Sequence, residues 1–192
     1  YMALFLVPIG VGLFVFQDFV VQLLLGPQWK LAGGVLGSWA LSSAIMTVTA
    51  NLISEIFRAK GMPNLSFWTQ VLHLVVLIPV IYICIQYDFT TFVYARSIVR
   101  MEMLAVAMLF LALFVNMSAF RILSNISVYL IIASLVGALA YSILHLYDTV
   151  LWTIACMLLC VLLYVAILCI IPSERAIITS GVNKVLRKVR RS

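Results

Sequence analysis

Long apolar runs separated by short polar breaks make up most of this chain. A helix needs roughly 20 apolar residues to cross about 30 Å of hydrocarbon, and these runs are continuous, without the alternating polarity of a barrel strand. They predict six transmembrane helices, at residues 1–16, 33–57, 65–86, 91–115, 122–146 and 149–171. Because the connections are short, neighbouring helices should be antiparallel. We therefore expect an all-α, polytopic membrane helical bundle over residues 1–171.

Two further segments are predicted to lie outside the membrane core. Residues 17–30 are apolar but too short to cross after a full span, and they end in Gly26-Pro27 with Trp29 suited to an interfacial position. This pattern predicts a short helix along the outer surface. The tail, 172–192, has apolar residues at helical spacing with bases between them. It predicts a basic amphipathic helix on the anionic inner leaflet, and a disordered basic tail is the alternative.

Composition places most of the chain in lipid. Apolar residues make up 66% and charged residues 9% of the sequence, and mean hydropathy is +1.22. Soluble domains have about 45–50% apolar and about 25% charged residues. This composition excludes a soluble enzyme, a nucleic-acid-binding protein and a disordered module.

The positions of the charges predict one orientation. Lys and Arg concentrate on the cytoplasmic side of membrane proteins, and here they follow the second, fourth and sixth predicted spans, whereas acids dominate the opposite loops. The bases are Arg58, Lys60, Arg121, Arg175, Lys184, Arg187, Lys188, Arg190 and Arg191, and the opposite loops carry Asp18, Asp88, Asp148 and one base, Lys30. We expect a multi-pass protein of the cytoplasmic membrane with a cytoplasmic carboxyl terminus. The net charge of +6 is then mainly a topology signal, with the tail bases also contacting membrane lipids.

Three ionisable residues fall inside the predicted span 91–115. Arg96 and Arg100 are four residues apart and share a helix face, whereas Glu102 lies on nearly the opposite face. Such residues face protein or water, because each costs a few kcal/mol in hydrocarbon. One interpretation is that Arg96 snorkels outward while Arg100 and Glu102 pair structurally with other helices. The other is a water-filled cavity whose guanidinium groups attract a phosphate or carboxylate.

Polar stripes mark the two preceding spans. Ser43, Thr47, Asn51 and Glu55 recur every four residues in the span 33–57, and we expect Glu55 to pair locally with Arg58.

In the span 65–86, Gln70 and His73 lie on a related stripe with Ser66 and Thr69. For His73 the alternatives are an interhelical hydrogen bond and a proton relay. The candidate substrate-cavity residues are therefore Arg96, Arg100, Glu102, Asn51, Thr47, His73 and Gln70.

No motif predicts covalent chemistry. The four cysteines lie in apolar runs without a CxxC partner, so we expect no metal site, and neither a catalytic residue nor a cofactor is indicated.

The first 65 residues or so carry a resemblance to a known family. Leu6-Val7-Pro8-Ile9-Gly10-Val11-Gly12 lies in one span, Asp18 to Trp29 reads DFVVQLLLGPQW, and Arg58 to Asn64 reads RAKGMPN after the next span. This order resembles the carboxyl-terminal half of the polysaccharide exporters and lipid-linked oligosaccharide flippases of the multidrug/oligosaccharidyl-lipid/polysaccharide (MOP) transporter superfamily. Those proteins typically show a Pro-containing span, a surface segment ending in Leu-Leu-Gly-x-x-Trp and a Gly-containing turn.

The resemblance implies a function and partners. The chain would be most of one lobe of a two-lobed transporter that moves polyprenyl-diphosphate-linked glycans by alternating access, without covalent chemistry. Its partners would be a lipid-linked anionic glycan and an amino-terminal lobe of the same protein, which fits a chain that starts inside an apolar run. The alternatives are a cation-coupled multidrug exporter of the same superfamily, a membrane-embedded glycosyl- or acyltransferase, and a membrane scaffold.

Overall fold

The computed structural model describes residues 2–30, 32–144, 146 and 149–170, and its regular elements there are all helices. This confirms the predicted all-α class. The chain divides into two compact units, Met2–Ile131 and a second that runs from Ile132 onwards. The predicted basic tail, 172–192, with Lys184, Arg187, Lys188, Arg190 and Arg191, lies outside the described residues.

The larger unit contains α1 to α6 and the first part of α7. Its elements are α1 Met2–Val15, α2 Gln17–Leu25, the 3₁₀ helix η1 Pro27–Trp29, α3 Ala32–Met46, the π-helix η2 Thr47–Asn51, α4 Leu52–Ala59, α5 Pro63–Cys84, α6 Phe89–Val115 and α7 Ala119–Leu144. The second unit contains the rest of α7 and α8, Val150–Ile170. In it, Trp152 Nε1 donates a hydrogen bond to the Ile143 carbonyl at 3.1 Å.

Five helices in the described part of the chain are long and apolar enough to cross a membrane. They are Ala32–Ala59 (α3, η2 and α4 in succession), α5, α6, Ile122–Leu144 within α7, and α8. These helices make the chain a multi-pass membrane protein by length and composition.

The predicted first span, 1–16, has a different form. α1 has 14 residues, about 21 Å at 1.5 Å per residue, which is less than the hydrocarbon thickness. It counts as a sixth candidate span only together with α2, from which it is separated by an 80° bend. The predicted surface segment 17–30 is helical, as α2 and η1.

A tight turn after α4 reverses the chain into α5. Gly61 has φ +73°, its amide donates to the Arg58 carbonyl at 3.0 Å, and the Met62 amide donates to the Phe57 carbonyl at 2.9 Å. These bonds form a Schellman motif, which needs a residue in the left-handed region and therefore favours glycine. Pro63 then begins α5, where its missing amide proton costs no helix bond.

An apolar cluster joins α4 to α6 near this turn. Ile53 and Phe57 of α4 pack with Ala107 and Leu111 of α6, and all four are at most 1% exposed. Because the interior of a protein is close-packed, this cluster holds the two helices in one register.

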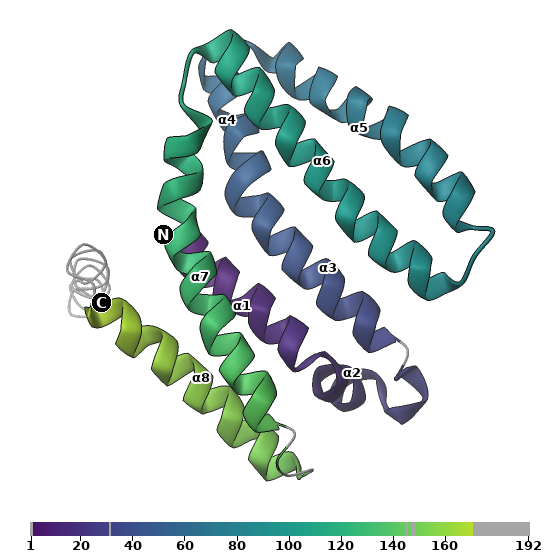
Figure 1. The fold of residues 1–192 in the computed structure, drawn as a ribbon, viewed down its shortest axis with the longest axis vertical. Coiled ribbons are helices and arrows are strands. Elements are labelled where there is room, and N and C mark those ends of the chain that lie inside the picture. The colour runs from purple at the N-terminus through teal and green to yellow at the C-terminus, as the bar shows by residue number, and fades with distance from the viewer. Residues whose placement is uncertain (1, 31, 145, 147–148, 171–192) are drawn as a thin grey trace, which may run out of the picture. The chain divides into compact units, whose positions relative to one another are not determined.

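α3 is the central helix of the larger unit. It contacts α1 and α2 as well as α6, and α5 packs on α6, so that α3, α6 and α5 lie side by side (Figure 1). A Cβ added at Gly10 of α1 would lie 2.5 Å from Ala44 Cβ and 3.3 Å from the Ala40 carbonyl oxygen. Small residues therefore let α1 and α3 approach closely, as is common between membrane helices.

The first prediction concerns this close approach. Gly10→Ala should destabilise the protein by about 1–3 kcal/mol, because the new methyl group overpacks the contact between α1 and α3. Thermal unfolding of the purified chain in detergent measures the effect. Gly12→Ala is the matched control, since a Cβ at Gly12 meets nothing within 4 Å. Equal melting temperatures for the two variants would show that α1 does not pack on α3 through Gly10.

Candidate functional site

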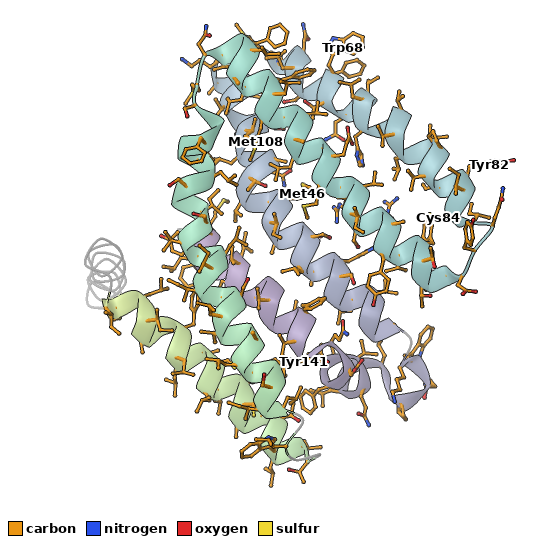
Figure 2. The ribbon with its side chains drawn as sticks, in the orientation of Figure 1. Met46, Trp68, Tyr82, Cys84, Met108 and Tyr141 are labelled. Carbon is orange, nitrogen blue, oxygen red and sulfur yellow. The ribbon has the colours of Figure 1, made fainter. Side chains whose placement is uncertain are left out.

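A cavity of about 340 Å³ lies among α3, η2, α5 and α6, entirely within the unit Met2–Ile131. It is lined by side chains from the last turn of α3, from η2 and from the middle parts of α5 and α6; Met46 of α3 is labelled in Figure 2. The lining residues are Ser43, Met46, Thr47, Asn51, Gln70, His73, Leu77, Arg96, Arg100 and Met103.

The cavity brings together residues that the sequence singled out on three separate spans. Of the seven candidates, six line it: Thr47, Asn51, Gln70, His73, Arg96 and Arg100. The seventh, Glu102, lies behind the lining, against His73. The proximity of these residues is a structural fact, and their part in binding a substrate remains a prediction.

Both arginines make contact with α3. Arg100 Nη1 donates a hydrogen bond to Ser43 Oγ at 2.9 Å, and the Arg96 guanidinium carbon lies 5.6 Å from the ring centroid of Trp39, within cation–π range. Trp39 and Ser43 are one turn apart on α3, as Arg96 and Arg100 are on α6. The two contacts between these helices therefore lie one helical turn apart. In the part of the chain that the structure describes, no carboxylate lies within 4.0 Å of either guanidinium.

Glu102 faces α5 instead. Its Oε2 lies 3.1 Å from His73 Nδ1, and the side chains of His73 and Glu102 are 12% and 27% exposed. Because residues two apart on a helix point in nearly opposite directions, the carboxylate contacts α5 while Arg100 contacts α3. The positive charge of the arginines is therefore left without a carboxylate in contact.

The π-helix η2 shapes one wall of the cavity. It begins at Thr47 and ends at Asn51, both of which line the cavity, and Thr47 Oγ1 donates to the Ser43 carbonyl at 2.8 Å. Residues spaced four apart drift slowly around an α-helix, because one α-turn contains only 3.6 residues. A π-turn contains more residues, so it turns the chain less over the same four-residue step. The π-helix thus reduces the drift of the stripe and keeps Asn51 on the cavity side.

The stripe ends at Glu55, which does not line the cavity. Glu55 Oε1 accepts a hydrogen bond from Arg58 Nη1 at 2.9 Å, and the two side chains are 65% and 63% exposed. The predicted local ion pair is therefore confirmed.

Thr69, on the stripe of α5, donates to the Leu65 carbonyl of its own helix at 2.9 Å and also lies outside the lining.

Sequence reasoning missed four residues of the site. Trp39 lies one turn before Ser43, so extending the polar stripe by four residues could have found it. Met46, Leu77 and Met103 line the cavity, but apolar residues in apolar runs carry no such signal. Met103 also contributes a weak acceptor, because its Sδ lies 3.8 Å from Gln70 Nε2.

Comparison with known proteins gives no match: no family model matches the chain, nor does any curated protein or solved structure.

The second prediction tests whether water reaches the cavity. In a variant with the four native cysteines replaced by serine, Thr47→Cys should react with a hydrophilic anionic thiol reagent at least about tenfold faster than Thr49→Cys, because a buried thiol reacts only after local opening. Thr49 is the matched control, since it belongs to the same π-helix and is 0% exposed. Mass spectrometry over time gives the two rates. Similar rates would mean that the cavity is closed to water.

Proposed function

We propose that this chain forms part of a membrane transporter that holds the diphosphate of a lipid-linked glycan in its cavity and moves the glycan across the cytoplasmic membrane by alternating access. The observation that carries the proposal is the pair Arg96 and Arg100. Both guanidinium groups line a cavity between membrane-spanning helices, and neither has a carboxylate partner among the described residues.

The chemistry of the lining favours an anion with several oxygens. A guanidinium group presents several N–H donors in a planar fork that matches phosphate and carboxylate oxygens. Arg100 uses Nη1 on the Ser43 hydroxyl, which leaves further donors for a ligand. The cavity also presents the hydroxyl of Thr47 and the amides of Asn51 and Gln70, which suit phosphate oxygens or sugar hydroxyls.

The volume limits what the cavity can hold. About 340 Å³ is near the lower end of the roughly 300–1,000 Å³ of ligand pockets. It accommodates a diphosphate and the groups next to it, but not a whole oligosaccharide. The sugars would extend beyond the cavity towards the amino-terminal lobe that the family resemblance implies.

The same proposal assigns the remaining parts of the chain. The carboxyl terminus would be cytoplasmic, with the basic tail on anionic lipids. The transporter would need no cofactor and make no covalent bond to its substrate, because binding energy and movement of the two lobes suffice. A cation-coupled multidrug exporter is less well supported, since a coupling cation would favour acidic residues in the cavity, whereas the charged residues of its lining are Arg96 and Arg100.

The third prediction concerns Arg100. Inorganic pyrophosphate should bind to the purified chain in lipid nanodiscs. Arg100→Ala should weaken this binding by about ten- to a hundredfold, which is the effect expected from losing one hydrogen bond to a charged group. Arg100→Lys should give an intermediate loss, because a lysine keeps the charge but not the planar fork. Isothermal titration calorimetry measures the affinities.

Arg58→Ala is the control for this experiment, since Arg58 is exposed and pairs with Glu55 outside the cavity. In cells that carry the complete transporter, Arg100→Ala should also reduce surface polysaccharide at matched membrane expression. Equal loss of pyrophosphate binding in the Arg58 and Arg100 variants would contradict the proposal. Binding of a lipophilic cation in place of pyrophosphate would favour the multidrug exporter.

A further inference from the structure

His73 lies between the cavity and Glu102. Its side chain lines the cavity from α5, and its Nδ1 is 3.1 Å from Glu102 Oε2 on α6. A carboxylate that binds one ring nitrogen fixes the orientation of an imidazole and leaves the other nitrogen for a ligand. Within the described residues, His73 makes no second hydrogen bond through its ring.

Few other charged groups belong to the packed helices around His73. From Ala32 to Asn51, α3 and η2 contain no ionisable side chain. α4 contributes Glu55 and Arg58, which pair with each other and are largely exposed, and no other acidic or basic side chain lies on α5. Besides Glu102, the charged groups of α6 are Arg96 and Arg100.

These groups act on the imidazole in opposite directions. A carboxylate attracts positive charge on the ring that it contacts, whereas the two guanidinium groups that line the same cavity oppose a third positive charge there. An anion bound at the arginines offsets that opposition and adds an acceptor for the free ring nitrogen. Protonation of His73 and occupation of the cavity by an anion therefore favour each other.

We infer that His73 is a third, protonatable donor of the anion site, held in position by Glu102, and that the anion binds together with a proton. The proton comes from water and joins the free ring nitrogen, and no covalent bond to the ligand forms. This inference rests on the proposed function and adds to it that the affinity of the site is regulated by pH.

Sulfate is a suitable probe because it keeps its charge between pH 5.5 and 8.5. Calorimetry on the native chain in lipid nanodiscs should show that sulfate binds about tenfold more tightly at pH 5.5 than at pH 8.5. This is the effect expected of one nearby opposite charge. In two buffers of different ionisation enthalpy near neutral pH, the native chain should also take up a fraction of one proton per sulfate. This second measurement requires no variant.

The variants identify the responsible group. His73→Gln keeps a donor for Glu102 but does not titrate in this range, so its affinity should be nearly the same at both pH values. Glu102→Gln should move the rise in affinity to lower pH, because the amide retains the contact without the negative charge, and Glu102→Asp should restore it in part. The chain has two histidines, and His145→Gln, the matched control, should keep the native pH profile.

The outcomes separate the two proposals. Binding that depends on Arg100 but is equal at both pH values and takes up no proton would overturn the role of His73 and leave the proposed function standing. A native pH profile in the His73→Gln variant would likewise overturn the role of His73 and leave the proposed function standing. If neither sulfate nor pyrophosphate binds in a manner that depends on Arg100, the anion site itself is wrong, and the role of His73 with it.

Discussion

A guanidinium group cannot be solvated by hydrocarbon, and the arrangement of the larger unit follows from this constraint. Arg100 is the twelfth of the 27 residues of helix α6, too deep to reach water at the end of that helix. It needs protein or water beside it, and α3 supplies the Ser43 hydroxyl at 2.9 Å. Glu102 likewise needs a polar partner on the other side of α6, and it contacts His73 of α5. One helix with charges on two faces thus requires a neighbour on each face.

The spacing of the charges along α6 decides which of them can pair with one another. Had Glu102 been one full turn from Arg100, the two could have formed an ion pair within the helix, as Glu55 and Arg58 do at three residues' spacing in α4. A separation of two residues turns the carboxylate away to His73. Among the described residues, the positive charge of the arginines then has no carboxylate partner, although it costs a few kcal/mol to place in a membrane. A charge arrangement that served only stability would instead place a carboxylate against each arginine.

The fold class, the spans from Ala32 onwards and the polar residues of the site could be predicted from sequence because each depends on local rules. Length sets the spans, and helical periodicity puts Arg96 and Arg100 on one face. The 80° bend between α1 and α2, the π-helix and the contact of Arg96 with Trp39 could not. They depend on which helices become neighbours, and between apolar helices that choice is made by close fit, as of Gly10 against Ala44.

The partners of the two arginines bear on whether the site is structural or binds a ligand. The hydroxyl of Ser43 and the indole of Trp39 orient the guanidinium groups without neutralising them. In the proposed function, an arriving anion would therefore not have to displace a carboxylate, and it would meet donors whose conformational entropy is already reduced by those contacts. A short distance along the same helices, Ile53, Phe57 and Leu111 form an apolar, nearly fully buried cluster that anchors α4 to α6. The proposed anion site would depend on both features, because donors must be held in position by their neighbours and by the packing of the helices that carry them.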